Sequence, residues 1–477
     1  MRSAIDSGES VGQHRITGVV FGAALLLVSL SACSRNDRTG AEAAGKRTQT
    51  TPPAETPRGV FGDLGRVCSP GSAKGDTAQG VSGTEIEVGT IADPGFVGRP
   101  GLNQEIFDAA LVFTRWCNAA GGIQGRQLQL NLRDARVTEY RARMVEACEK
   151  DFALVGGGGA FDGTGVRDRL ECLLPDFAVF VVGAEARDSD LLLQIGPTPI
   201  DAYPAGDLRW LATRFPNTSS HVAAITAAYP AGILNQSQAE VAAAANGMTI
   251  IYSGQYNAIG ETTWVPVAQS LKARGVRGLI WTGEPQNLAR LARALVDIDY
   301  ELDWIRVDPN HYDDSFITAG GDAVQNTYMR ADFVPFEKAV AKSATQQYLD
   351  IFERYLPNGR RRTFLGVKAF SAWLLFARAA DACGSNLTRY CLVSRAEEIG
   401  SKGWTGGGLQ SPVNVPAAEP SSCYLIIEAT PKGFRFPSVA KTDGPYNCDP
   451  ENVVRIPGAV KGGLRLADVG RKAADLL

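Results

Sequence analysis

Histidine is scarce in this chain, with three residues among 477. Only His221 and His311 follow the N-terminal apolar segment, so the rest of the chain offers little for general-base catalysis. No two cysteines have the C-x-x-C spacing of a zinc site, and we expect no metal site. No G-x-S-x-G motif occurs after Cys33, which argues against a hydrolase with a nucleophile elbow.

Phosphate-binding loops are also missing. The run Gly156 to Gly159 continues as Ala160-Phe161-Asp162 and lacks the Gly-Lys-Ser/Thr of a Walker loop. No register of the run puts glycine at all three positions of G-x-G-x-x-G. The run instead predicts a tight turn whose backbone amides face a polar ligand group. We expect no cofactor.

The chain contains one short match to a catalytic motif, of a kind that is common by chance because only two positions are fixed. Ser438-Val439-Ala440-Lys441 fits the pattern S-x-x-K, which in some acyl-transfer enzymes starts a helix. Pro437 before it and Gly444-Pro445 after it disfavour that helix start. An exported hydrolase therefore stays an alternative of low weight, and the chain is not expected to be an enzyme.

The chain has little net charge. The formal net charge is −3, and removing residues 1–32 leaves it unchanged because two basic residues (Arg2, Arg15) and two acidic ones (Asp6, Glu9) are lost. No basic stretch typical of nucleic-acid binding occurs. With 44% hydrophobic residues, the remaining stretch of about 390 residues can build a core larger than one ordinary domain.

The N-terminus carries the one long apolar run. Ile16 to Leu30 is uncharged and is short for a membrane span but suited to the core of a signal peptide. It runs into Leu30-Ser31-Ala32-Cys33, which resembles a bacterial lipobox and predicts a lipid on Cys33. A signal peptide with a chance cysteine and the end of a buried helix are the alternatives. Residues 34–82 are poor in large apolar side chains and predict a flexible tether.

The stretch from Thr84 to Ala135 has the clearest secondary-structure signals. Ile86 and Val88 alternate with Glu and Gly and predict a strand, which Asp93-Pro94-Gly95 ends. A helical pattern then runs to Gly121-Gly122, and alternating leucines predict a second strand. Such a unit makes its strands parallel, and its first loop opens at the sheet edge where α/β proteins bind ligands. Further alternation predicts two α/β lobes with doubly wound, Rossmann-like sheets.

A resemblance rests on the end of this helix. The sequence Asn118-Ala119-Ala120-Gly121-Gly122-Ile123-Gln124-Gly125-Arg126, followed by a strand and Arg133-Asp134, is similar to extracytoplasmic substrate-binding proteins of branched-chain amino acid and amide ABC transporters. In that family a turn of this kind joins the first two strands. The similarity continues with lower specificity to about Ala429. It implies a type I periplasmic-binding-protein fold, with two lobes joined by three hinge crossings near residues 200, 309 and 417.

The resemblance also implies domain bounds. They are a signal peptide and lipobox at 1–33, the tether at 34–82, lobe one at 83–200 and 310–417, lobe two at 201–309 and 418–450, and a C-terminal segment at 451–477 without an assigned role. Eight cysteines remain after Cys33, and they permit 105 pairings. Family habit and spacing favour Cys148–Cys172, Cys383–Cys391 and Cys423–Cys448, which leaves Cys68 with Cys117.

Matching the family's ligand loops to this chain gives a candidate site. The expected ligand-binding residues are Asp93, Phe96, Gly157, Gly158, Gly159, Ala160, Phe161, Ala184, Glu185, Tyr203, Tyr229, Glu284 and Gln286. Amino-acid-binding members usually offer Ser or Thr hydroxyls, which the first three loops lack here. Gln286 takes the place that best matches the family's acidic residue. Amides and modified amino acids therefore rank beside leucine-like ligands.

These observations predict a solute-binding protein attached by a lipid to the outer face of the cell membrane. Its expected partners are a small polar solute, an ABC transporter permease and the membrane, with no nucleic acid and with a monomeric chain. A surface receptor that senses a ligand with the same fold is the alternative from another functional class, because fold alone does not separate transport from sensing.

Overall fold

The structure is a computed structural model, and it describes residues 58–341, 343–439 and 444–477. The predicted lipobox with Cys33, the signal peptide and residues 34–57 of the predicted tether lie outside these ranges. In the described part, no helix is both long and apolar enough to cross a membrane.

Lobe one is built on a parallel sheet. Its strands lie in the order β2 (Gln127–Asp134), β1 (Glu85–Ala92), β3 (Ala153–Val155) and β4 (Asp176–Phe177). The expected alternation is present in β1, where Ile86 and Val88 are buried. The helices of this lobe are α1 (Gln104–Ala119), α2 (Tyr140–Lys150), α3 (Val166–Glu171), α9 (Ala344–Tyr355), α10 (Phe364–Cys383) and α11 (Arg389–Gly400). The carboxyl ends of its parallel strands thus meet at one edge.

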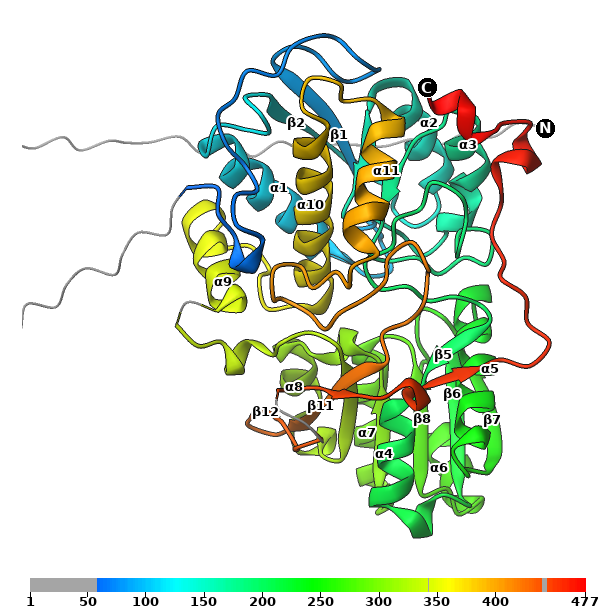
Figure 1. Cartoon of the computed structure of the whole chain (residues 1–477). Coiled ribbons are helices and arrows are strands. Elements are labelled where there is room, and N and C mark those ends of the chain that lie inside the picture. The colour runs from blue at the N-terminus through cyan, green and yellow to red at the C-terminus, as the bar shows by residue number, and fades with distance from the viewer. Residues whose placement is uncertain (1–57, 342, 440–443) are drawn as a thin grey trace, which may run out of the picture. The chain divides into compact units, whose positions relative to one another are not determined.

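Lobe two carries a larger sheet. Its path is β12 (Gly433–Arg435), β11 (Cys423–Thr430), β10 (Thr327–Ala331), β9 (Trp304–Val307), β8 (Gly278–Thr282), β6 (Val222–Ala227) and β7 (Ile250–Tyr256), and β13 (Asn447–Cys448) pairs with β11. The strands from β6 to β10 are parallel, whereas β11 is antiparallel to β10. Its helices are α4 (Gly206–Arg214), α5 (Pro230–Ala245), α6 (Val265–Ala273), α7 (Pro285–Asp297) and α8 (Asp314–Gly320) (Figure 1). Every residue of β6 is buried, as expected for a central parallel strand.

The chain crosses between the sheets more often than expected. It enters lobe two through β5 (Ala202–Pro204) and leaves it after β10, so the expected crossing near residue 309 is wrong. The reason is that residues 327–331 still add a strand beside β9, although Arg330 interrupts their apolar pattern. A later crossing precedes β11, where Phe333 and Gln410 form a bridge between two crossing segments.

The C-terminal segment provides a fourth crossing. β14 (Val453–Arg455) pairs antiparallel with β5, with Val454 opposite Tyr203. The chain then returns to lobe one, where the Leu464 N–H donates to the Glu185 carbonyl at 3.0 Å. Leu466 is buried beside Val166 and Leu170. Figure 1 shows this red segment passing from the lower sheet to the upper lobe. The segment left without a role by the sequence therefore joins the two lobes.

Residues 58–82 do not form the expected tether, because they pack on lobe one. Phe61, Val67 and Cys68 are almost completely buried. The Phe61 ring lies 5.2 Å from that of Phe370, and Cys68 is bonded to Cys117 of α1. The segment has few apolar side chains, but nearly all of them find a place in the core, which composition alone does not reveal.

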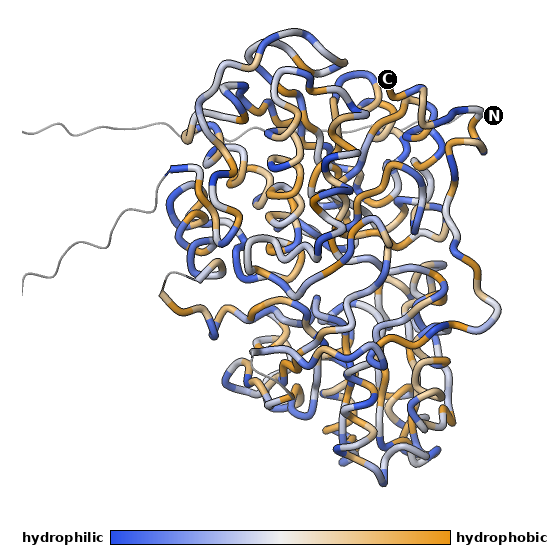
Figure 2. The backbone as a smooth tube through the Cα atoms, viewed as in Figure 1, coloured by the Kyte–Doolittle hydropathy of each residue, from blue (hydrophilic) through white to orange (hydrophobic). Residues whose placement is uncertain are grey.

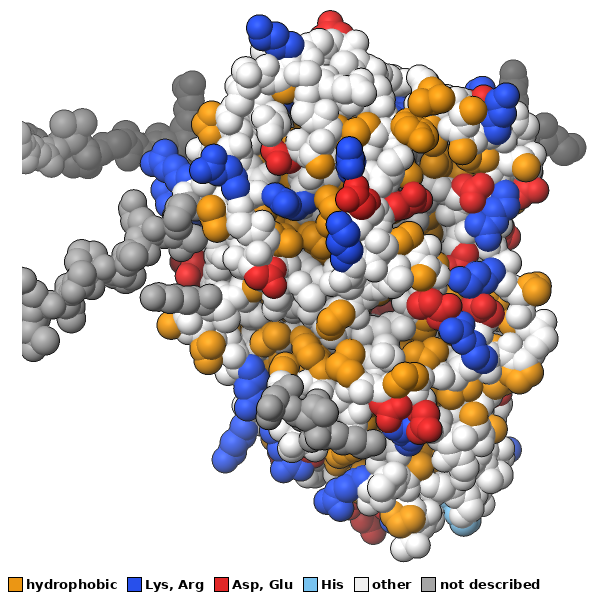
Figure 3. Space-filling model, in the orientation of Figure 1, with side chains coloured by type: hydrophobic (Ala, Val, Ile, Leu, Met, Phe, Trp, Pro, Cys, Tyr) orange, Lys and Arg blue, Asp and Glu red, His pale blue; other side chains and the backbone are white. Residues whose placement is uncertain are grey.

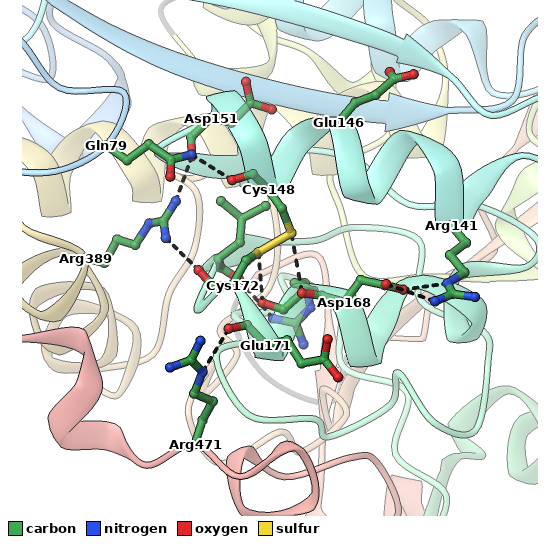
Figure 4. The surroundings of a disulfide bond; sticks show 12 residues. Gln79, Arg141, Glu146, Cys148, Asp151, Asp168, Glu171, Cys172, Arg389 and Arg471 are labelled. Atoms are coloured by element: carbon green, nitrogen blue, oxygen red, sulfur yellow. Dashed lines mark hydrogen bonds and ion pairs between the residues drawn. A yellow bond between two sulfur atoms is a disulfide. The ribbon is translucent and has the colours of Figure 1, made fainter.

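All four disulfides implied by the resemblance are present, namely Cys68–Cys117, Cys148–Cys172, Cys383–Cys391 and Cys423–Cys448. The second one lies where distant segments meet (Figure 4). Gln79 donates to the Cys148 carbonyl at 2.8 Å, Arg389 to the Cys172 carbonyl at 2.7 Å and Arg471 to the Glu171 carbonyl at 3.0 Å. Residues beside the bridge therefore contact both the segment 58–82 and the C-terminal segment.

Aromatic side chains fill the centre of lobe one. Trp373 on α10 is fully buried and stacks on Phe113 of α1, with ring centres 5.4 Å apart. In Figure 2, where the trace is coloured by residue hydropathy, hydrophobic residues follow the strands and the inner helices. On the face drawn in Figure 3, acidic and basic side chains lie beside one another, in keeping with surface pairs such as Arg209–Glu451 at 2.6 Å. Burial of apolar area and not surface charge thus accounts for most of the stability.

Candidate functional site

The loops expected to bind a ligand are found at the strand ends of the two lobes, but several of their groups are already occupied. Asp93, after β1, is completely buried. Its carboxylate accepts the N–H groups of Val137 at 2.8 Å and Ala160 at 3.0 Å. Burial raises the pKa of Asp93, although these two hydrogen bonds oppose the rise. Asp93 thus holds two loops of lobe one together.

The glycine run is required by close packing. At Gly158, whose φ is +149°, a Cβ would lie 2.0 Å from the Phe180 carbonyl oxygen. At Gly159, it would lie 2.7 Å from the Tyr140 ring. The Gly158 N–H donates to the Ile91 carbonyl at 3.0 Å, and the Ala160 N–H is held by Asp93. These two amides are therefore used inside lobe one, contrary to the expectation that they face a ligand.

Other predicted residues of lobe one lie nearer to solvent. Phe161 is 39% exposed, Phe96 is half-buried, and Ala184 and Glu185 are exposed. Asp162, directly after Phe161, is buried and accepts the N–H groups of Val182 at 3.0 Å and Gly183 at 2.7 Å. These bonds fix the loop that carries Ala184 and Glu185 against the one that carries Phe161.

Lobe two contributes two tyrosines. Tyr203 on β5 is 4% exposed, and its hydroxyl has no partner in the described part of the chain. Burial raises its pKa. Tyr229 follows β6 at the start of α5 and is half-buried, and burial and then Asp308 raise its pKa. Both phenols are therefore neutral hydrogen-bond donors at neutral pH.

Glu284 forms an ion pair with Arg99 of lobe one, so its carboxylate is not free for a ligand ammonium group. The pair connects the loop after β1 to the start of α7. Gln286, within α7, is half-buried. Arg360 adds a second connection on this side of the molecule, because it lies 3.1 Å from Glu105 of lobe one and 3.2 Å from Asp313 of lobe two.

Two arginines near the tyrosines were missed by the sequence analysis. Arg306 on β9 is buried and pairs with Asp207 at 2.7 Å and Asp308 at 2.8 Å, with its guanidinium 5.8 Å from the centre of the Tyr203 ring. Arg187 of lobe one donates to Gln238 of α5 at 2.9 Å. Its position just after the loop Gly183 to Glu185 was the available signal. We call Arg187, Tyr203, Tyr229, Arg306 and Asp308 the interlobe cluster.

The cluster consists of charged groups and phenols from both lobes. Among residues 58–341, 343–439 and 444–477, no three metal-ligating side chains come together. His311 is fully buried, and burial lowers its pKa to about 3, so it is neutral in this fold. Lys441 of the S-x-x-K match lies outside the described residues. What the two lobes offer is a set of charged groups and phenols that can orient a ligand.

A match to a family model shows which protein family the chain belongs to. The model of the periplasmic binding protein family matches residues 101–433, which is most of the chain. The chain belongs to this family. The match ends before β14, so the fourth crossing lies beyond the part of the chain that the family model covers. A search of curated proteins found no match.

Solved structures of other proteins share the fold of this chain. A fatty acid ABC transporter substrate-binding protein from Thermomonospora curvata is 16% identical, with a TM-score of 0.66 over 79% of this chain and 96% of that one. A branched-chain amino acid ABC transporter protein from Thermus thermophilus with bound valine is 11% identical, with a TM-score of 0.64 over 77% and 98%. At these identities the likeness establishes the type I fold and not the ligand.

Proposed function

We propose that this periplasmic binding protein captures a small solute between its lobes and delivers it to an ABC permease. The observation that supports this most is the interlobe cluster, in which Arg187 of lobe one hydrogen-bonds to lobe two near Tyr203 and Tyr229. Members of such folds bind by closing two lobes about their crossings, which excludes water from the ligand. The protein performs no chemical step on its ligand in this proposal.

The proposed binding site is tested with the variant Tyr229→Ala. Loss of the half-buried ring should weaken binding of the cognate solute by about 1–3 kcal/mol, because contact area with the ligand is lost. Calorimetry on the solute that stays bound through purification, identified by mass spectrometry, measures this. Tyr390→Ala is the control, because Tyr390 is 46% exposed on α11 of lobe one. Equal affinity of parent and Tyr229→Ala would contradict the site.

The location is part of the same proposal. The chain is exported, and a lipid on Cys33 attaches it to the outer face of the membrane as a monomer. A Cys33→Ala variant should be released from membranes or left unprocessed, since a diacylated terminus binds bilayers far more firmly than one chain does. Metabolic labelling with a fatty acid and membrane fractionation check this, with Cys33→Ser as a second variant. Unchanged labelling would disprove the anchor.

A further inference from the structure

Arg187 is a buried cation without a carboxylate partner. It is 4% exposed, and its hydrogen bonds go to two neutral acceptors, the Val182 carbonyl at 3.1 Å and Gln238 Oε1 at 2.9 Å. The bonding atoms are Nε and Nη1, and Nη2 has no acceptor within the described ranges. Burying a charge without a counter-ion is costly. Burial accordingly lowers the pKa of Arg187.

The other buried arginines in the described part of the chain make more contacts, and Arg169 donates to the Leu174 carbonyl at 3.3 Å, to Ser189 Oγ at 2.7 Å and to the Asp190 carbonyl at 2.9 Å. Arg133 pairs with Asp151, and Arg306 with Asp207. Arg126 has no carboxylate but donates from all three nitrogens to backbone carbonyls, among them those of Ser82 at 2.8 Å and Gly384 at 2.9 Å. Arg187 differs because it makes only two hydrogen bonds within the described residues, both to neutral acceptors, and because one of them reaches Gln238 of lobe two.

The carboxylates around Arg187 do not neutralise it by contact. Asp162 has the strongest electrostatic effect on Arg187 but forms no ion pair with it. Its oxygens accept the N–H groups of Gly163, Val182 and Gly183, and burial raises its pKa to about 6. Asp188, the next residue in the chain, also acts on Arg187 only through space. A further anion is therefore favoured at this position.

Two tyrosines of lobe two lie within electrostatic range of Arg187. Tyr229 and Tyr203 both interact electrostatically with Arg187, and the Tyr203 hydroxyl is buried and unpartnered. A phenol donates one O–H, and a guanidinium offers two parallel N–H groups to a carboxylate. Gln238 holds Arg187 in position while it also donates to the carbonyls of Pro199 at 2.9 Å and Ile200 at 3.0 Å in the first crossing.

We propose that Arg187 binds the carboxylate of the solute, with Tyr229 and Tyr203 as hydrogen-bond donors, so that the ligand is a small carboxylic acid in its anionic form. The inference rests on the proposed function and narrows it, because neutral amides lack the anion that Arg187 needs. It also explains how a site can bind a carboxylate when its first loops have no Ser or Thr hydroxyl.

The test is calorimetry on a chain that begins at residue 34 and therefore lacks the cysteine that would carry the lipid. The ligands are pairs of compounds that differ only in whether they carry a carboxylic acid or the corresponding amide. The pairs are L-leucine and L-leucinamide, 4-methylpentanoate and 4-methylpentanamide, and octanoate and octanamide. At least one acid should bind, and its amide should bind at least 30-fold more weakly. Arg187→Gln should remove most of this preference by weakening the acid at least 30-fold and the amide less than threefold.

Arg167→Gln is the matched control, because Arg167 is exposed on α3 and makes one hydrogen bond, to the Asp468 carbonyl at 3.2 Å. It should leave both affinities unchanged. If Arg187→Gln does not fold, the acid and amide affinities of the parent protein still show whether the ligand must be a carboxylate. Amides that bind as tightly as their acids, or an Arg187→Gln variant that keeps the acid affinity, would overturn the inference and leave the proposed function standing. Binding of none of the six compounds would also overturn the inference, whereas the proposed function is decided by the solute that stays bound through purification.

Discussion

Replacing Arg306 by methionine is expected to reduce the free energy of unfolding by about 3–5 kcal/mol, because a buried ion pair is broken on one side only. The side chains of Arg306 and Asp207 are 3% and 1% exposed, so Asp207 cannot regain water once its partner is lost. Burial opposes the charged form of Arg306, but Asp207, Tyr203 and Asp308 together raise its pKa. Urea unfolding followed by tryptophan fluorescence measures the loss.

Two further variants separate this cause from a loss of packing. Arg306→Met combined with Asp207→Leu should recover a large part of the stability, since no buried charge is then left unpaired. Arg395→Met should change the unfolding free energy by less than about 0.5 kcal/mol, because Arg395 and Glu398 are an exposed helical pair. A loss below 1 kcal/mol in Arg306→Met would show that Asp207 is hydrated in the native state.

Replacing Lys368 by methionine is expected to have a similar effect, about 3–5 kcal/mol. Lys368 on α10 of lobe one is 1% exposed, and its Nζ lies 3.0 Å from Asp332, the residue that follows β10. The pair thus fastens the second crossing to lobe one. Burial opposes ionisation of Asp332, but Lys368 and Arg330 outweigh it, so the pKa of Asp332 is below its usual value.

The pH dependence of this variant has a definite sign. In the parent, the lowered pKa of Asp332 gives stability that is present above the unfolded pKa of 3.8 and is lost as the pH falls through the folded value. Without Lys368, burial raises the pKa of Asp332, and the variant takes up a proton on folding. The difference in unfolding free energy between parent and variant should therefore shrink from pH 7 to pH 4. A constant difference would contradict this assignment.

The lobes could be predicted because their signals are local. Alternation in β1, the glycines after α1 and the continuous apolar run of β6 each follow from the period of one element. The resemblance then placed these elements in a family and paired the cysteines. Asp93, Tyr203 and Tyr229 were predicted by matching the family's ligand loops to this chain; Asp93 and Tyr229 lie just after β1 and β6, whereas Tyr203 lies within β5.

What the sequence did not reveal depends on partners distant in the chain. Asp93 reads as a polar loop residue, but Val137 and Ala160 occupy its carboxylate. β10 reads as a linker, but β9 and β11 flank it on both sides. Arg187 reads as a surface arginine, but in the fold it is buried and donates to Gln238 of α5. Composition cannot report such contacts, because each depends on how two segments meet after folding.

Because of the fourth crossing, the segments that connect the two lobes are arranged in pairs. The first and fourth crossings lie side by side through β5 and β14, and the second and third meet at Phe333 and Gln410. Each connection between the lobes is therefore a two-ply ribbon whose strands run in opposite directions. Such a ribbon can flex across its plane while its hydrogen bonds resist shear between the plies, so lobe two can swing toward lobe one but is hindered from sliding past it.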